Sequence, residues 1–169
     1  DEMGPWLLHF SPDGELLAPP VELPEDAGGA LRSASHPQVL AGRARARLRS
    51  SRGFESLATG PGEGATLLAM LEGGVEGDPP GVLRIYEFDP ARAAWTGRRW
   101  QYRLQDPAHL ASELARLDAD GHYLVLERDE LQGDAARFKQ VLGFALGRAA
   151  QDDAAAPAAA TGRAVVDLL

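Results

Sequence analysis

Residues 55–72 read ESLATGPGEGATLLAMLE, and residues 112–130 read SELARLDADGHYLVLERDE. Each stretch places two short apolar runs around a turn rich in Gly, Pro or Asp, which is the pattern of an antiparallel hairpin. A further apolar run follows each stretch, LRIYEFDP at 83–90 and KQVLGFALG at 139–147. The pattern therefore occurs twice, and Leu57-Ala58 in the first copy matches Leu114-Ala115 in the second.

This repeat predicts an all-β fold, a β-propeller-like array of antiparallel blades. We expect further strands in WLLHF at 6–10, WTGRRWQYRL at 95–104 and GRAVVDLL at 162–169. A propeller closes only with at least about four blades, whereas this chain holds about two complete units. We therefore expect a partial propeller, a single domain over residues 1–169 that is a fragment of a longer protein. The Ala-rich residues 149–162 are expected to form a loop or linker.

A long stretch without clear apolar periodicity separates the first strands from the repeat. Residues 24–52 predict a surface excursion with a short helix or strand near 38–48. Arginines alternate within it, so a strand would place four charges on one face: Arg43, Arg45, Arg47 and Arg49. A solvated face and an anion-binding site both fit this pattern.

Composition limits the function classes. The 169 residues carry a formal net charge of −8, which argues against a sequence-independent nucleic-acid binder, since such proteins need a basic face. The chain has no cysteine, which excludes disulfides, thiol catalysis and Cys-based metal sites. No apolar run approaches the ~20 residues of a membrane-spanning helix.

Carboxylates recur at the ends of the predicted strands. Glu55 begins one strand, Glu72 ends the next, and Glu127 and Asp129 end YLVLERD on one face of it. Since propeller strands lead toward a shared central channel, these side chains would meet there. Clustered carboxylates can bind Ca²⁺ or divide acid and base roles, and they can also pair with arginines and cap turns.

The four histidines show no metal-ligand spacing, and no phosphate-binding or serine-hydrolase motif is present. His9 fits a structural role within a strand, and His122 follows a turn and is expected to be exposed. The aromatic residues Trp95, Trp100 and Tyr102 fit packing between blades better than ligand stacking.

Several segments, in order, resemble the phytase-like family, described as "esterase-like activity of phytase". They are DEMGPWLLHFSPDGELL, RGFESLA, Glu72, LRIYEFD, SELARLDADGHYLVLERD, AARFKQVLGFAL and GRAVVDLL. The resemblance implies a propeller-like, exported protein, periplasmic or secreted, that hydrolyses phosphoric esters. The chain departs from the family pattern at Met3 and in the arginine-rich stretch 41–52.

Carried over to this sequence, the resemblance implies the acidic set Asp1, Glu2, Glu55, Glu72, Glu113, Glu127 and Asp129, and a metal-assisted phosphoric-ester hydrolase would use it as follows. Glu55, Glu127 and Asp129 would be catalytic, and Ca²⁺ would be bound by Asp1, Glu2, Glu72 and Glu113. Arg52 and Arg128 would contact the phosphate of a small-molecule ester, since guanidinium matches phosphate geometry.

Two other functions fit the same residues. The first is a non-catalytic extracytoplasmic β-propeller that binds a ligand or protein partner, in which the glutamates pair with arginines at strand ends. The second is a lactonase or sugar-acid hydrolase, which rests on fold analogy alone. The oligomeric state stays open.

Overall fold

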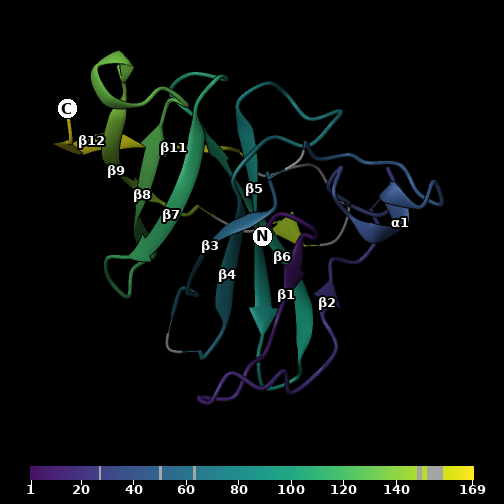
Figure 1. Ribbon diagram of the computed structural model, residues 1–169. Helices are drawn as coiled ribbons and strands as arrows, with labels where there is room; N and C mark the ends of the chain where they lie inside the picture. The colour runs from purple at the N-terminus through teal and green to yellow at the C-terminus, as the bar shows by residue number, and fades with distance from the viewer. Residues whose placement is uncertain (27, 50, 63, 148–149, 152–157) are drawn as a thin grey trace.

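The computed structural model describes residues 1–169 except 27, 50, 63, 148–149 and 152–157. It is almost entirely β and consists of two antiparallel sheets side by side, preceded by a short hairpin (Figure 1). The hairpin pairs β1 (Trp6–Leu7) with β2 (Val21–Glu22). The expected all-β class is confirmed.

The first sheet is a meander in which each strand pairs with the next along the chain. It contains β3 (Phe54–Thr59), β4 (Leu67–Leu71), β5 (Val82–Asp89) and β6 (Ala94–Arg103). Two short strands extend it beside β6, namely β10 (Ala150–Gln151), which is antiparallel, and β11 (Ala160–Thr161), which is parallel. These two strands lie within the expected linker 149–162, of which residues 149 and 152–157 lie outside the described residues.

The second sheet repeats the meander. It contains β7 (Leu110–Arg116), β8 (His122–Arg128), β9 (Lys139–Ala145) and β12 (Arg163–Asp167), in the spatial order β12-β9-β8-β7. A single 3₁₀ turn, η1 (Gly133–Ala135), lies in the connection between β8 and β9.

The two meanders pack against each other like neighbouring blades of a propeller, because their first strands, β3 and β7, are in contact. Each first strand also carries a β-bulge near its start, at Glu55 opposite β4 and at Ser112 opposite β8. The two bulges hold the same place in the sequence repeat, because each lies just before the matched Leu-Ala pair. The structure is therefore consistent with the predicted partial propeller.

Apolar side chains from both sheets form the main core between them. Leu68, Met70 and Ile85 of the first sheet lie in one cluster with Val125 and Leu142 of the second. All five are at most 1% exposed. Burying such a side chain contributes about 1.5–3 kcal/mol, so this interface stabilises the pair of sheets.

The chain before β3, which we call the N-terminal segment, covers the face of the first sheet that is opposite to the main core (Figure 1). Leu31 and Leu48 of this segment are buried in a second cluster with Phe54 and Leu71. The prediction of a surface excursion is therefore incomplete, because this segment completes a core. Its one helix among the described residues is α1 (Pro37–Leu40), and residues 41–47 form turns and irregular chain instead of an alternating strand.

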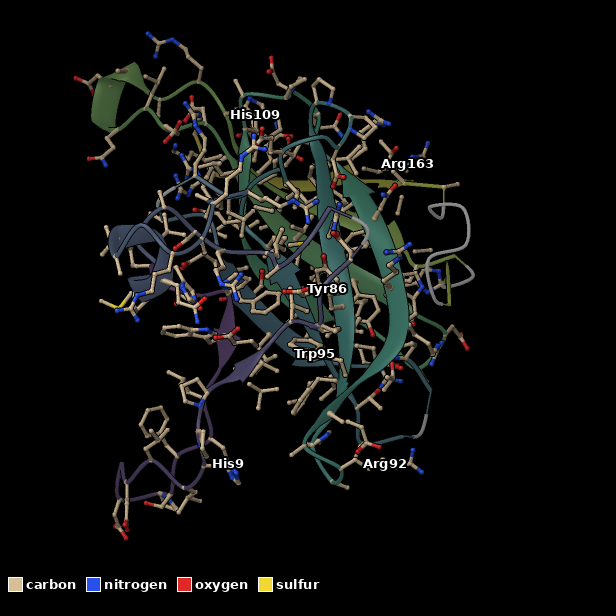
Figure 2. All side chains as sticks on the ribbon, turned by 90° about the vertical axis from the view of Figure 1, so that its right-hand side faces the viewer. His9, Tyr86, Arg92, Trp95, His109 and Arg163 are labelled. Atoms are coloured by element: carbon tan, nitrogen blue, oxygen red, sulfur yellow. The ribbon has the colours of Figure 1, made fainter. Side chains whose placement is uncertain are left out.

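Aromatic side chains extend this second core toward the edge of the sheet, where Tyr86 and Trp95 lie close together (Figure 2). The Phe54 ring lies 5.6 Å from that of Trp95 and 6.1 Å from that of Tyr86, measured between centroids. Trp95 also donates a hydrogen bond of 2.8 Å to the carbonyl of Glu22. The prediction of packing between blades is therefore wrong for Trp95, which packs against the N-terminal segment, and is confirmed for Trp100 and Tyr102, which lie in the core between the two sheets. In the described part of the chain, no helix is long and apolar enough to span a membrane.

Candidate functional site

The candidate site lies where β4, β6 and β8 end, at the upper end of both sheets in Figure 1. The chain there forms a cavity of about 560 Å³, which we call the strand-end cavity. Its walls come from residues 46–49 and 52, the β4–β5 loop, the β6–β7 connection and Glu130 after β8. The polar residues among them include Arg49, Arg52, His109 and Glu130.

Glu72 is buried beneath this cavity and is held by two arginines. Its Oε2 accepts a hydrogen bond of 2.9 Å from Arg52, and its Oε1 accepts one of 2.8 Å from Arg128. Arg52 also donates to Glu130 over 2.6 Å. The predicted phosphate contacts Arg52 and Arg128 therefore share a carboxylate, and both oxygens of Glu72 are occupied.

Strand register explains this pairing. Directly after the two equivalent bulges, Ser56 is opposite Met70 on β4 and Glu113 is opposite Leu126 on β8, so Met70 and Leu126 hold the same place in the two meanders. Glu72, the second residue after Met70, therefore corresponds to Arg128, the second residue after Leu126. By register Glu72 thus corresponds to Arg128 and not to Glu127, and the two corresponding residues form an ion pair across the sheets.

Glu127 has no exposed surface and lies between the two sheets. Its Oε2 accepts a hydrogen bond of 2.9 Å from the Tyr102 hydroxyl, and its Oε1 accepts one of 2.7 Å from the Gln105 backbone N–H. The Nδ1 atom of His109 lies 2.8 Å from Oε1. Burial and the neighbouring Glu127 carboxylate raise the pKa of Tyr102, which keeps its hydroxyl a donor.

Asp129 fixes the β8–β9 connection. It accepts hydrogen bonds from the backbone N–H groups of Arg137 and Phe138, at 2.7 and 3.1 Å, and pairs with the Lys139 ammonium. The Lys139 ammonium and these two N–H groups lower the pKa of Asp129 to about 2. Asp129 therefore carries a negative charge at neutral pH, held by its own loop.

The other predicted carboxylates lie apart from Glu127. Glu55 is the exposed bulge residue of β3 and pairs with the Asp1 amino group. The Asp1 carboxylate accepts hydrogen bonds from the N–H groups of Met3, Gly4 and Trp6, while Glu2 and Glu113 are exposed. Among the described residues, no group of three or more His, Asp or Glu side chains is placed to hold a metal ion. These residues do not fit a metal site as they are placed, and calcium binding by them stays a prediction.

Arg49 differs from the other arginines that line the strand-end cavity. Arg52 pairs with Glu72 and Glu130, and Arg47 pairs with Asp26. The guanidinium of Arg49 has no hydrogen bond or ion pair within the described residues, although its charge adds weakly to the hydrogen bond and charge of Arg52, which lower the pKa of Glu130. Arg49 is also exposed, so it can contact an incoming anion.

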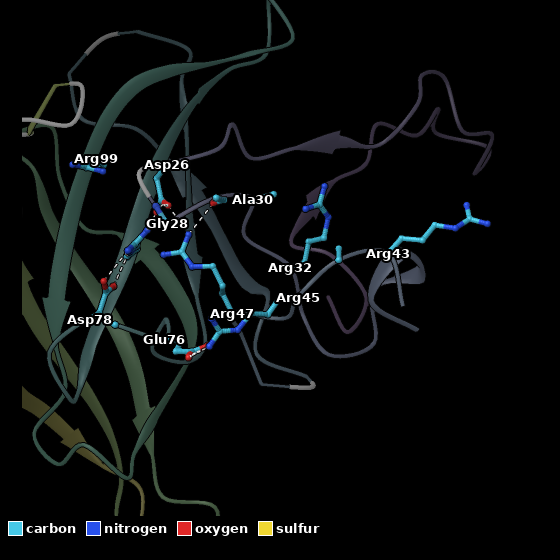
Figure 3. Close-up of a pocket in the computed structure, with 14 residues that line it drawn as sticks. Asp26, Gly28, Ala30, Arg32, Arg43, Arg45, Arg47, Glu76, Asp78 and Arg99 are labelled. Carbon is cyan, nitrogen blue, oxygen red and sulfur yellow. Dashed lines mark hydrogen bonds and ion pairs between the residues drawn. The ribbon is translucent and has the colours of Figure 1, made fainter. Parts of the chain in front are cut away.

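A second, larger cavity of about 790 Å³ adjoins the first, and we call it the arginine-rich cavity (Figure 3). Six arginines and three acidic residues line it in the described part of the chain. Arg84 donates two hydrogen bonds of 2.7 Å to Asp78 and one of 2.6 Å to Asp26, and Arg47 also pairs with Asp26. These ion pairs tie the N-terminal segment to β5, so much of the positive charge has a structural role.

Sequence reasoning missed His109. The residue lies in the β6–β7 connection, far along the chain from Glu127, and no local motif links the two. A signal was present nonetheless, because Glu127 occupies an inward position of the apolar strand YLVLE. A buried carboxylate needs hydrogen-bond donors, so a polar partner facing β8 could have been expected.

A comparison with family models identifies the chain over its entire length. The model that matches residues 1–169 is phytase-like, described as "esterase-like activity of phytase". The chain belongs to the phytase-like family. No curated protein and no solved structure matches it. Membership of the phytase-like family supports a phosphoric-ester hydrolase-like domain, and the strand-end cavity is lined by arginines and a histidine.

Proposed function

We propose that this phytase-like domain hydrolyses phosphoric esters in the strand-end cavity. The observation that carries the proposal is the position of Arg49, a cation unpaired among the described residues, on the wall of a cavity that also contains Arg52 and His109. Family membership supports the reaction class. A volume of about 560 Å³ lies within the range of small-molecule sites.

The chemistry of phosphoryl transfer fits this combination. Negative charge develops on the phosphoryl oxygens during the reaction, so catalysis depends on positioning and on cations near those oxygens. A guanidinium can bind two phosphoryl oxygens at once, whereas a lysine acts as a point charge. Arg49 would supply this contact. The Arg52 guanidinium, which also pairs with Glu72 and Glu130, would add a second positive charge.

The test is hydrolysis of a panel of phosphoric mono- and diesters by the purified protein and by Arg49→Ala. A charge-assisted hydrogen bond contributes about 1.5–3 kcal/mol, so kcat/KM should fall about 10- to 100-fold in the variant. The matched control is Arg43→Ala, because Arg43 lines the arginine-rich cavity and points away from its centre (Figure 3). Equal activity of both variants would reject the strand-end cavity as the site, and an inactive wild-type protein would reject the function.

Calcium and export are further parts of the proposal. The described carboxylates form no group placed to hold a metal, so calcium binding rests only on the preference of Ca²⁺ for carboxylate oxygens, and calorimetric titration with and without Glu72→Gln would test whether Glu72 contributes. The proposed hydrolysis requires no step at a metal, since the described residues supply both the cations and a proton acceptor. A periplasmic or secreted location rests on family resemblance and is tested by cell fractionation.

A second candidate function is a non-catalytic extracytoplasmic propeller that binds a ligand or protein partner. The pairing of Glu72 with Arg52 and Arg128 favours it, since this candidate assigns the glutamates to ion pairs at strand ends. Phosphate binding without turnover of any ester would support this candidate over the hydrolase.

A further inference from the structure

We propose that His109 is the catalytic base of this hydrolase and that Glu127 positions it, an inference that rests on the function proposed above. In their roles, the two residues resemble the histidine–carboxylate pair of many hydrolases, although the sequence contains no motif that identifies them. Three features of the structure carry the inference: the ion pair, the orientation of the ring, and the second ring nitrogen.

Glu127 provides a fixed negative charge behind the imidazole. The carboxylate is inaccessible to solvent, and three groups from the β6–β7 region donate to it: Tyr102 OH, Gln105 N–H and His109 Nδ1. With Glu127 ionised, the ring nitrogen that faces it carries the proton. Because Glu127 is enclosed in this way, it cannot touch a substrate itself, so its earlier assignment as a catalytic residue becomes a positioning role.

The ring of His109 is held in one plane. It stacks on Phe138 with a centroid separation of 4.3 Å and an interplanar angle of 29°. The backbone N–H of His109 donates to the carbonyl of Asp106 over 2.9 Å, which fixes the turn that carries the ring. A hydrogen bond on one edge and a stacked face leave little rotational freedom to the imidazole.

The second ring nitrogen is available for chemistry. Within the described residues Nε2 of His109 has no hydrogen-bond partner, and it is not among the nitrogen atoms that the fold buries without one. His109 lines the strand-end cavity, where Arg49 and Arg52 would hold a phosphoryl group. A proton on Nδ1 leaves the lone pair on Nε2, which is the form of a general base.

In the proposed step, Nε2 takes a proton from a water molecule as the water oxygen attacks phosphorus. A new P–O bond forms and the P–O bond to the leaving alcohol breaks on the opposite side of phosphorus, so the leaving oxygen takes its proton from water and Nε2 releases its proton to solvent. Water and ester give phosphate and alcohol, and the imidazole ends neutral. Glu127 stabilises the imidazolium that forms in between, as the carboxylate does in serine hydrolases.

The other histidines do not offer this arrangement. Nε2 of His36 is buried without a hydrogen bond, and His9 lies on the projecting hairpin at the opposite end of the molecule from His109 (Figure 2). His122 is the closest chemical match, since its Nδ1 lies 2.7 Å from Asp118. That pair is exposed, however, and lines neither cavity.

The experiment compares His109→Gln with His122→Gln as the matched control. The first variant should lower kcat about 100-fold or more for alkyl phosphoric esters, with KM little changed, and the second should keep wild-type kinetics. A similar loss should be seen for 4-nitrophenyl esters, because the base acts on the attacking water and not on the leaving group. Melting curves would show whether each variant is folded.

A pH profile separates a base from a structural residue. Activity should fall at acidic pH as His109 takes up a proton, and this acidic limb should disappear in His109→Gln. Glu127 pairs with the ring and is itself bonded by Tyr102, and the charged residues that line the cavity together with His109 are Arg47, Arg49, Arg52, Glu76, Asp78 and Glu130. Glu127→Gln should lower kcat and shift the acidic limb to lower pH, because the imidazolium loses its stabilising charge and forms less readily. Asp118→Asn, the matched control, should shift nothing.

The outcomes distinguish the two proposals. An active wild-type protein whose His109→Gln variant is folded and retains kcat would overturn the role of His109 and leave the hydrolase function intact. A wild-type protein that hydrolyses no phosphoric ester would overturn the function and, with it, the inference. If Glu127→Gln is unfolded, the result with His109→Gln still decides.

Discussion

Asp26 anchors the N-terminal segment to the first sheet, and replacing Asp26 should lower the free energy of unfolding by an amount that can be worked out from its ion pairs. Asp26 bridges Arg47 on the segment and Arg84 on β5 over 2.5 and 2.6 Å. Burial alone would raise the pKa of its carboxyl, but hydrogen bonds from Arg47, Arg84 and the Gly28 N–H outweigh burial and lower the pKa from 3.8 to about 2. At 1.36 kcal/mol per pKa unit, this corresponds to about 2 kcal/mol of folding free energy.

The sign of the pH dependence follows from the lowered pKa. The stabilisation is complete above the unfolded-state pKa of 3.8 and is lost as the pH falls toward the folded-state value of about 2. Asp26→Asn should therefore lower the free energy of unfolding by about 2 kcal/mol at pH 7, and the difference from wild type should shrink between pH 4 and pH 2. The asparagine can still accept the Gly28 N–H, so the loop itself should persist.

Urea denaturation followed by tryptophan fluorescence measures this difference, since Trp95 packs under the same segment. Asp13→Asn is the matched control because Asp13 is exposed in a turn. The reasoning would be refuted by a cost at pH 7 within about 0.5 kcal/mol of zero, which is the usual range for an unimportant surface substitution. A cost that is as large at pH 2.5 as at pH 7 would refute it equally.

Two further predictions concern buried polar groups. Glu72→Gln should lower the free energy of unfolding by about 3 kcal/mol in the presence of a calcium chelator, because it leaves two arginines facing an uncharged amide; a cost that depends on calcium would instead indicate metal binding. An alkaline titration followed by absorbance should show almost no tyrosinate at pH 10, since burial raises the pKa of all three tyrosines: Tyr86, Tyr102 and Tyr123. Half-ionisation near pH 10 in the folded protein would contradict this burial.

The sequence allowed the strands of both sheets to be predicted because their signals are local. Alternating apolar residues and glycine-rich turns specify each hairpin without reference to the rest of the chain, and β3, β4, β7 and β8 lie where the pattern placed them. The bulges at Glu55 and Ser112 were not predicted, although they hold matching places in the two copies of the repeat.

The role of the N-terminal segment could not be predicted in the same way. Leu31 and Leu48 are buried from irregular chain, where no periodicity marks a core position. The alternating arginines suggested one charged strand face, yet Arg47 turns toward Asp26 and Arg45 toward Glu76. The carboxylate with which each arginine pairs is determined by tertiary packing and not by the spacing of the arginines along the sequence.

In the candidate site too, features local to one strand could be predicted from the sequence, whereas contacts between distant segments could not. The sequence singled out Glu72 and Glu127 by their positions at strand ends, and both are buried at that end of the sheets. The partners that define their chemistry come from other elements, Arg52 and Arg128 for Glu72, and His109 for Glu127. A pattern within one strand carries no information about a side chain that another segment of the chain brings to it.

The most direct test of the central claim is a crystal structure of the protein with bound orthovanadate, which mimics a phosphoryl group in transfer. We predict vanadate in the strand-end cavity, within hydrogen-bond distance of Arg49 and of Nε2 of His109. Vanadate bound in the arginine-rich cavity, with the strand-end cavity empty, would contradict the site and the roles assigned to these residues.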